Sequence, residues 1–265
     1  MDAKVNVICL KWGVRYPAHY VNRLYAGVKR NLSRPFRFVC FTDSPDGLAE
    51  GIETLPIPPP PEKLPEGKRW PSVFTKLALF RDGCGNLEGP TLFLDIDQMI
   101  IGPMDRFFDF NPGGFCIIHN WIERRKLIFR RRPDIGNSSC FRFEAGRFNR
   151  VWEAFRDGLA TAYDKRRFTT EQAFMTHAVG LENIKWWPEG WVASFKRSCH
   201  RPFPLNLFKP PKTPPPDSSI LCFHGDPSPE EAIAGFTEHH GRKVRIHQRT
   251  LPAPWLDRLW KDGTL

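Results

Sequence analysis

The sequence predicts an α/β fold in which a mixed β-sheet is flanked by helices, in a single domain over residues 1–265. Three observations favour this class. Short apolar segments alternate with amphipathic helical segments in the first third of the chain. An apolar run, Thr91 to Leu94, stops at two carboxylates, and ligands of open α/β sheets bind at such strand ends. The chain is 41% hydrophobic, with 22 Phe and 9 Trp, which excludes a disordered protein.

The first elements form a β-α-β unit. We expect strands at residues 5–9 and 36–41 on either side of a helix at residues 18–32. The helix has apolar residues at a spacing of three and four, which predicts one buried face: Val21, Leu24, Tyr25, Val28 and Leu32. The proline-rich residues 56–65 cannot continue a helix and are expected to form an extended connection.

The later elements combine parallel and antiparallel strands. The predicted strands are residues 91–94, 114–119, 139–143 and 220–223, and the predicted helices are residues 73–80, 147–159 and 170–179. Residues 202–216 contain seven prolines, so we expect an irregular loop on the surface.

The net charge of +10 and the pI near 9.4 favour polyanions, which include nucleic acids, anionic lipid headgroups and nucleotide phosphates. The densest basic runs, residues 124–126, 130–132 and 165–167, are equally consistent with anion binding and with solvated surfaces. No apolar run is long enough to span a bilayer, and no export signal is recognisable. The seven Cys are scattered, so neither a disulfide framework nor a zinc site is indicated. We therefore expect a cytoplasmic protein that can associate with the inner face of a membrane.

Asp95 and Asp97 flank Ile96 directly after the apolar Leu92-Phe93-Leu94. Two carboxylates at a strand end can bind one hard cation, Mn²⁺ or Mg²⁺, which in turn neutralises a diphosphate. The pattern is common, and two surface carboxylates in a turn are the alternative. The preceding buried strand favours the metal site.

A second apolar strand ends at His224-Gly225-Asp226-Pro227. His224 is a candidate third metal ligand, and Gly225 would let a phosphate approach the backbone. The alternative for His224 is an ordinary hydrogen-bonded polar residue.

These residues resemble the bacterial glycosyltransferases of the GT-A fold, close to the glycogenin-like and lipopolysaccharide galactosyltransferase group, family 8. The motifs cover most of the chain and are, in order, Leu10-Lys11-Trp12-Gly13, Tyr20 to Gly27, Phe41-Thr42-Asp43, Lys76-Leu77, Leu92 to Asp97, Asn137-Ser138-Ser139, Thr170-Glu171-Gln172 and Phe223 to Pro227. The resemblance implies a GT-A-like, Rossmann-related sheet. It also implies a nucleotide-binding half at residues 1–110 and an acceptor- and sugar-binding half at residues 111–265.

The implied activity is metal-dependent transfer of a hexose from a nucleotide-diphosphate sugar, of the uridine diphosphate type, to a hydroxyl of a carbohydrate, glycolipid or protein acceptor. The group implies retention of the anomeric configuration. The metal ligands implied are Asp95, Asp97 and His224.

The resemblance also implies donor contacts. Base and ribose would be bound by Leu10, Lys11, Trp12, Gly13, Thr42 and Asp43. The sugar and diphosphate would be bound by Lys76, Ile96, Asn137, Ser138, Ser139 and Gly225. Glu171 and Gln172 are similar to the acid–amide pair near the anomeric carbon.

Each donor-binding residue has a structural alternative: a core aromatic for Trp12, turns for Asp43 and for Asn137 to Ser139, and a solvated helix position for Lys76. Glu171 is equally consistent with an acid in the first turn of a helix that Thr169 or Thr170 caps.

One position departs from the family pattern. Related families often carry a Lys two or three residues after the His-Gly, where it binds the diphosphate, and here Ser228 stands in that stretch. Lys196 or Arg197 could supply the missing charge, and we take Lys196 as the candidate.

Two other functions compete with sugar transfer. A nucleic-acid-binding protein would use the basic runs, but no nucleic-acid module is recognisable and the aromatics fall in apolar runs, so we expect no nucleic-acid partner. A sugar-nucleotide-binding relative without activity is the other alternative, which the departure at Ser228 favours.

Overall fold

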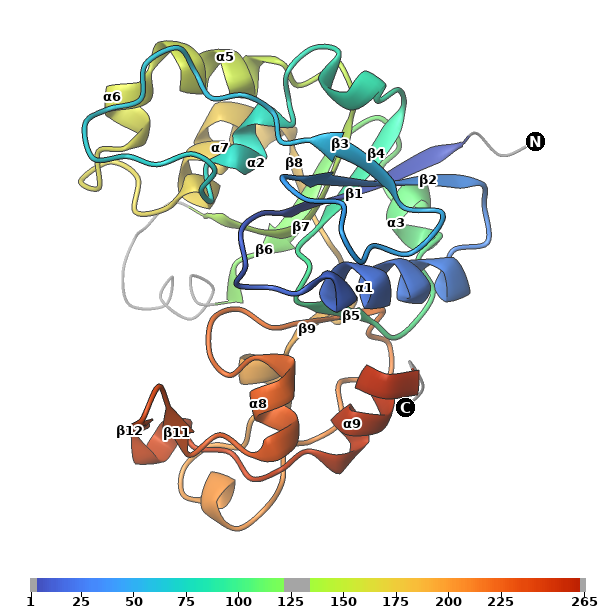
Figure 1. Ribbon diagram of the computed structural model, residues 1–265, viewed down its shortest axis with the longest axis vertical. Coiled ribbons are helices and arrows are strands. Elements are labelled where there is room, and N and C mark those ends of the chain that lie inside the picture. Colours follow the sequence, from blue (N-terminus) through green and yellow to red (C-terminus); the bar gives the residue numbers. More distant parts are fainter. Residues whose placement is uncertain (1–3, 122–133, 263–265) are drawn as a thin grey trace. The chain divides into compact units, whose positions relative to one another are not determined.

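The structure is a computed structural model that describes residues 4–121 and 134–262 (Figure 1). The chain forms two compact units. The first unit comprises Met1–Val21, Arg34–Ile96 and Asp105–Trp187, and the second comprises Asn22–Ser33, Asp97–Met104 and Pro188–Leu265. The division expected at residue 110 concerns which ligand each half binds, and it stays a prediction.

The first unit is built on a mixed sheet of seven strands, which confirms the predicted fold class. Its order is β3 (Glu53–Pro56), β2 (Phe36–Thr42), β1 (Val5–Lys11), β4 (Pro90–Leu94), β7 (Gly136–Glu144), β6 (Phe115–His119) and β8 (Ile184–Trp186). The first four strands are parallel, β7 is antiparallel to both of its neighbours, and β8 is parallel to β6.

The central strands bring three carboxyl ends to one edge of this sheet. β1 pairs with β2 along its whole length, from Val5 opposite Phe36 to Lys11 opposite Thr42. Every residue of β1 is buried, as expected for a central parallel strand. Because β4 is parallel to β1, the loops that follow β1, β2 and β4 all leave at the same edge.

One face of the sheet is covered by α2 (Thr75–Ala78), α5 (Arg150–Asp157), α6 (Leu159–Ala162) and α7 (Glu171–Val179), which lie together in Figure 1. The core between them is rich in phenylalanine. The ring centroids of Phe80 and Phe143 are 4.6 Å apart, and those of Phe93 and Phe141 are 4.8 Å apart. Much of the aromatic content of the sequence is therefore packing.

Among the described residues the longest helix is α1 (Ala18–Asn31), which has Lys29 and Arg30 in its last turn, where cations interact favourably with the helix dipole. α3 (Arg106–Asp109) lies in the first unit. Single turns occur at Cys84–Asn86, Leu181–Asn183, Phe195–Cys199, Leu205–Leu207 and Ile246–Gln248.

The second unit has its own three-stranded sheet, in the order β5 (Gln98–Ile100), β10 (Ile220–Cys222) and β9 (Val192–Ser194). β10 is antiparallel to β5 and parallel to β9. The unit also contains α8 (Pro229–Ala234), the pair β11 (Glu238–His239) and β12 (Arg242–Lys243), and α9 (Pro254–Asp262).

The structure differs from the sequence expectations mainly in short elements. The helix expected at residues 73–80 is only Thr75–Ala78, and strands β3, β5, β8 and β9, of three or four residues each, were not predicted. Such strands are too short to show a period. Helices α8 and α9 were also not predicted.

Residues 202–216 are irregular, as expected, apart from one turn at Leu205–Leu207. All seven cysteines are free thiols. In the described ranges no helix has the length and apolarity to cross a bilayer. The basic runs at residues 124–126 and 130–132 lie outside the described residues, and residues 165–167 form an exposed turn.

Candidate active site

Asp95 follows β4 directly and is held by a buried lysine. Its backbone N–H donates to Ser139 O at 2.9 Å, which extends the pairing of β4 with β7 by one residue. Lys76, on α2, places its Nζ 2.8 Å from Asp95 Oδ1 and 2.9 Å from Oδ2. The lysine side chain is 8% exposed and that of Asp95 is 28% exposed. Lys76 is therefore not a solvated helix residue, because it offsets the charge of the first carboxylate of the motif.

The same ammonium group connects Asp95 to the start of β7. Lys76 Nζ also lies 3.2 Å from Ser138 O and 3.3 Å from Ser138 Oγ. The Ser138 hydroxyl in turn donates to Glu171 Oε1 at 2.7 Å, and the Ser138 N–H donates to Gln172 Oε1 at 3.2 Å. The chain thus brings together four of the expected site residues with Asp95, and these five residues form what we call the lysine network.

Glu171 satisfies both interpretations of its sequence position. Thr170 caps α7, with its side chain accepting from Ala173 N, so Glu171 lies in the first turn of the helix, where a carboxylate is favoured. The same carboxylate is 7% exposed and is directed at Ser138 rather than into solvent. A helix N-terminus therefore delivers both Glu171 and Gln172 to the sheet edge.

Asn137 and Ser139 flank Ser138 in β7. Asn137 Oδ1 accepts from the backbone N–H of Ser139 at 3.1 Å, which is a local turn-like contact. The strand register shifts between Ile117 and Ile118 of the neighbouring strand, opposite this segment. The bulge accounts for the departure of this segment from regular pairing.

The loops after β1 and β2 meet at the same sheet edge. The Gly13 N–H donates to Asp43 Oδ2 at 2.8 Å, and both residues are exposed. Gly13 has φ +61°, a conformation that favours glycine. The two loops are thus joined by one charge-assisted hydrogen bond.

The neighbours of Gly13 and Asp43 are more buried. Leu10 is 5% exposed and belongs to the core, and Lys11 and Thr42 are each 7% exposed. Thr42 Oγ1 hydrogen-bonds to Ser44. Trp12 packs partly against the core, as the alternative of a core aromatic residue predicts. Ile96 is 7% exposed.

In the second unit, Asp97 and His224 come to the same end of the three-stranded sheet. Asp97 immediately precedes β5, and Gln98 pairs with Cys222, the last residue of β10. Because the two strands are antiparallel, the start of β5 lies beside the end of β10, where His224 follows. β9 is parallel to β10, so Ser194 and Lys196 also lie at this end.

His224 is held as a neutral imidazole. Its Nε2 lies 2.6 Å from the hydroxyl of Ser194, which is fully buried and also accepts from Arg197 N. Burial lowers the pKa of His224 to about 4, and the charges of Lys196 and Arg197 add to this effect. A neutral imidazole is the form that binds metals, although Ser194 contacts Nε2 in this structure.

Lys196 lies over the backbone of Gly225. A Cβ atom at Gly225, which has φ +67°, would be 3.3 Å from Lys196 Nζ. Burial lowers the pKa of Lys196, the charge of Arg197 lowers it further, and Asp226 opposes both. The sequence candidate for the missing charge is therefore next to His224-Gly225.

Ser228 has a structural role that accounts for the departure from the family pattern. Its side chain accepts from Glu231 N, and the Glu231 carboxylate accepts from the Ser228 N–H at 2.7 Å, which is a capping box at the start of α8.

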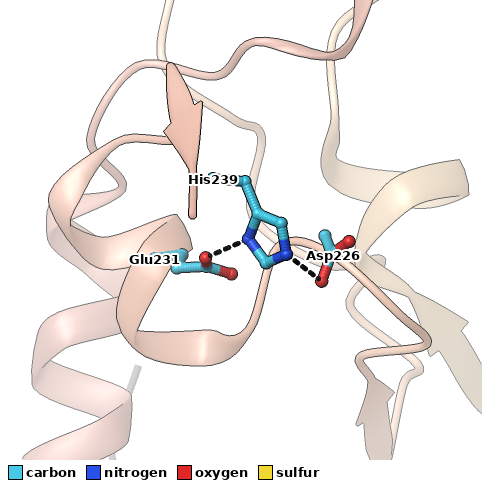
Figure 2. A group of neighbouring side chains, drawn as sticks. All are labelled: Asp226, Glu231 and His239. Carbon is cyan, nitrogen blue, oxygen red and sulfur yellow. Dashed lines mark hydrogen bonds and ion pairs between the residues drawn. The ribbon is translucent and has the colours of Figure 1, made fainter. Parts of the chain in front are cut away.

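A cluster of three titratable side chains, which the sequence did not indicate, lies close to the His224-Gly225 segment. His239 Nδ1 is 2.8 Å from Glu231 Oε1, and its Nε2 is 3.5 Å from Asp226 Oδ1 (Figure 2). These three side chains have the composition of a metal site. Asp226 and His239 also line a cavity of about 410 Å³ together with Lys196, Arg197, His200 and His247. The residues are too far apart in sequence to form a motif, and only the proximity of Asp226 to His224 pointed to them.

The fold is shared with known glycosyltransferases. The structure is similar to the apo structure of WbbM, a bifunctional glycosyltransferase, with a TM-score of 0.59 and 11% identity over 86% of this chain and 47% of that one. It is also similar to the galactosyltransferase LgtC in complex with donor and acceptor sugar analogues, with a TM-score of 0.55 and 12% identity over 84% and 88% of the two chains. An active-site mutant of LgtC has a TM-score of 0.50 and 11% identity, over 84% and 89%.

The chain spans about half the length of WbbM and most of LgtC. No protein-family model and no curated protein sequence matches the chain. The class that the structure defines is thus a GT-A-like α/β fold of the glycosyltransferase type, which confirms the expected fold.

Proposed function

We propose that this protein is a glycosyltransferase that moves a sugar from a nucleotide-diphosphate sugar to a hydroxyl acceptor. The observation that carries the proposal is the lysine network at the carboxyl end of β4. Lys76 joins Asp95 to Ser138, and Ser138 joins Glu171 and Gln172, so buried charged groups converge where open α/β sheets bind ligands. The GT-A-like fold agrees with this activity.

The proposed metal ligands are Asp95, Asp97 and His224. Two carboxylates and a neutral imidazole suit Mn²⁺, and the depressed pKa of His224 keeps the imidazole neutral at neutral pH, with one ring nitrogen unprotonated and able to bind a metal. A bound Mn²⁺ or Mg²⁺ would offset the negative charge that develops on the departing diphosphate. Lys76 limits the charge of Asp95, so the carboxylate stays ordered when the cation is absent.

The diphosphate would be bound by Lys196 and by the backbone at Gly225. Gly225 lacks a Cβ and lies under the Lys196 ammonium, so a phosphate oxygen can accept from both the main chain and the lysine. In this proposal Lys196 supplies the positive charge that a lysine after the His-Gly supplies in the related families, while Ser228 caps α8 instead.

The donor sugar would contact Ser138, Gln172, Asn137 and Ser139, and Glu171 would lie near the anomeric carbon. Glu171 is held by Ser138 rather than free to move, which favours electrostatic stabilisation and positioning over attack by a mobile nucleophile. Gly13 and Asp43, joined across two loops, would hold base and ribose, with Lys11, Trp12 and Thr42 beside them.

The donor is proposed to be a uridine diphosphate hexose, transferred with retention to a carbohydrate, glycolipid or protein hydroxyl. A thermal-shift screen of sugar nucleotides with and without Mn²⁺ tests this proposal. We expect uridine diphosphate to raise the melting temperature only when Mn²⁺ is present, and Asp97→Ala to abolish the increase. Exposed Asp82→Ala is the matched control and should respond as the wild type does. Equal responses with and without Mn²⁺ would contradict metal dependence.

A further inference from the structure

His239 lies between two carboxylates in the second unit (Figure 2). Its Nδ1 is 2.8 Å from Glu231 Oε1, and its Nε2 is 3.5 Å from Asp226 Oδ1. One carboxylate oxygen of each acid and one ring nitrogen lie within 4.8 Å of one another. The three side chains are between 29% and 48% exposed, so dissolved ions can reach them.

The two nitrogens of this ring have different surroundings. The contact between Nδ1 and Glu231 has the length of a hydrogen bond, whereas the 3.5 Å between Nε2 and Asp226 is long for one. Two ligand atoms that bind one Zn²⁺ tetrahedrally, with bonds of about 2.0–2.1 Å, are about 3.4 Å apart. The gap between His239 Nε2 and Asp226 therefore has the width that one metal ion needs.

Glu231 is held in a position that orients the ring. Its Oε2 accepts from the Ser228 N–H at 2.7 Å in the capping box of α8, which leaves Oε1 for His239. A hydrogen bond from Nδ1–H to a carboxylate fixes the tautomer in which Nε2 has a free lone pair, as is usual for metal-binding histidines. The buried Phe236 ring, whose backbone hydrogen-bonds in both directions with Thr250, meets the imidazole edge-on at 5.8 Å between centroids. The histidine is therefore oriented before any ion binds.

The cavity and the charges beside this ring suit a divalent ion with nitrogen and oxygen ligands. Asp226 and His239 both line the cavity of about 410 Å³, so water can supply the remaining coordination positions. Lys196 and Arg197 line the same cavity. Asp226 and Glu231 together neutralise a divalent ion, so its binding adds no net charge beside these cations. Zn²⁺ accepts nitrogen and oxygen ligands together, whereas Mg²⁺ and Ca²⁺ prefer oxygen.

We propose that Asp226 and His239 bind a zinc ion, with Glu231 as the positioning residue. The three residues come from the loop after β10, the first turn of α8 and the hairpin of β11 and β12. β11 and β12 have two residues each, which is too short for an isolated hairpin to be stable. The ion would therefore join this hairpin to the loop that contains His224 and Gly225. The site uses different residues from the metal site proposed for sugar transfer and does not depend on that activity.

Equilibrium dialysis against Zn²⁺, followed by metal analysis, tests the proposal in the Asp97→Asn variant, which lacks a ligand of the other proposed metal site. Mg²⁺ is present in excess to fill sites made of oxygen ligands alone. We expect one Zn²⁺ per chain. His239→Asn or Asp226→Asn, each added to Asp97→Asn, should weaken zinc binding by more than ~100-fold. Glu231→Gln should weaken it by about 10–100-fold, because glutamine retains the capping box but not the charged acceptor for Nδ1–H.

His240→Asn and Glu238→Gln are matched controls, because they make the same chemical changes at the exposed neighbours of His239. Asparagine tolerates the φ of +48° at His240, so this control keeps the backbone. Both controls should bind zinc as Asp97→Asn does, and circular dichroism should show that every variant is folded. Absence of zinc binding in Asp97→Asn, or binding that His239→Asn leaves unchanged, would overturn the proposal. An equal loss in His240→Asn would assign the ion to exposed imidazoles and would overturn it as well.

Discussion

Replacing Lys76 with Met should destabilise the folded protein by about 2–3 kcal/mol. Removing one partner of a fully buried ion pair costs about 3–5 kcal/mol, because the other charge is left uncompensated. Lys76 is 8% exposed, but Asp95 is 28% exposed, so water can reach the orphaned carboxylate and reduce the cost. Met retains the length of the side chain, and the loss therefore reports the ammonium contacts to Asp95 and Ser138.

Urea denaturation at pH 7 of the wild type, Lys76→Met, Asp95→Asn and the double variant would measure this effect as a cycle. We expect a coupling energy of about 2 kcal/mol between the two residues, because they are in direct contact. A coupling below about 0.5 kcal/mol would show that the two side chains act independently and would refute the lysine network.

The same variant tests the proposed role of Asp95 toward a metal. Lys76 offsets the charge of Asp95, so Mn²⁺ should raise the melting temperature of Lys76→Met more than that of the wild type. An equal increase in both proteins would mean that Asp95 does not bind the cation.

Three further predictions concern stability and nucleotide binding. Arg142 is 1% exposed and donates to the carbonyls of residues 107, 108 and 110, so Arg142→Leu should cost about 3 kcal/mol or more in urea denaturation, and Arg142→Lys should not restore it. Gly225→Ala should weaken binding of uridine diphosphate, because the added methyl group crowds Lys196. Gly190→Ala is the control: at φ +92° with open space around it, it should lower the free energy of unfolding by the backbone strain of about 1–2 kcal/mol and leave the binding unchanged. The pKa of His224 is about 4 in the folded chain against an ordinary 6.5, so between these pH values the unfolded chain binds a proton at His224 and the folded chain does not. The free energy of unfolding should therefore be unaffected by this residue above pH 6.5 and should fall toward pH 4, by up to ~1.4 kcal/mol per pH unit. His224→Asn should flatten this slope in denaturation curves measured across that range. Unchanged stability in Arg142→Leu, equal donor affinity in the two glycine variants, or an unaltered pH slope would contradict the respective prediction.

The long elements of the fold were predictable because they carry a strong local pattern. β1, β2 and β4 are apolar runs, and α1 has a clear helical period, so the sequence was sufficient for the parallel half of the sheet. β5, β8 and β9 are three residues each, and their pairing depends on tertiary contacts that no local window contains. The antiparallel placement of β7 between β4 and β6 likewise follows from packing.

The candidate site was predictable where a residue follows a strand end. Asp95 and His224 were identified in this way, and their contacts with Lys76 and Ser194 required the structure. Arg142 was missed because a buried arginine that binds backbone carbonyls has no sequence signature. Ser228 was judged against a family pattern, whereas its capping box with Glu231 explains the residue in local terms.

Release of nucleoside diphosphate from a panel of sugar nucleotides tests the central claim most directly. The assay compares the wild type with Asp97→Asn, in the presence and absence of Mn²⁺. We predict that the wild type releases uridine diphosphate from at least one donor in the presence of Mn²⁺, and that Asp97→Asn reduces the rate by at least ~100-fold. The absence of release from every donor, or a rate that Asp97→Asn leaves unchanged, would contradict a metal-dependent glycosyltransferase.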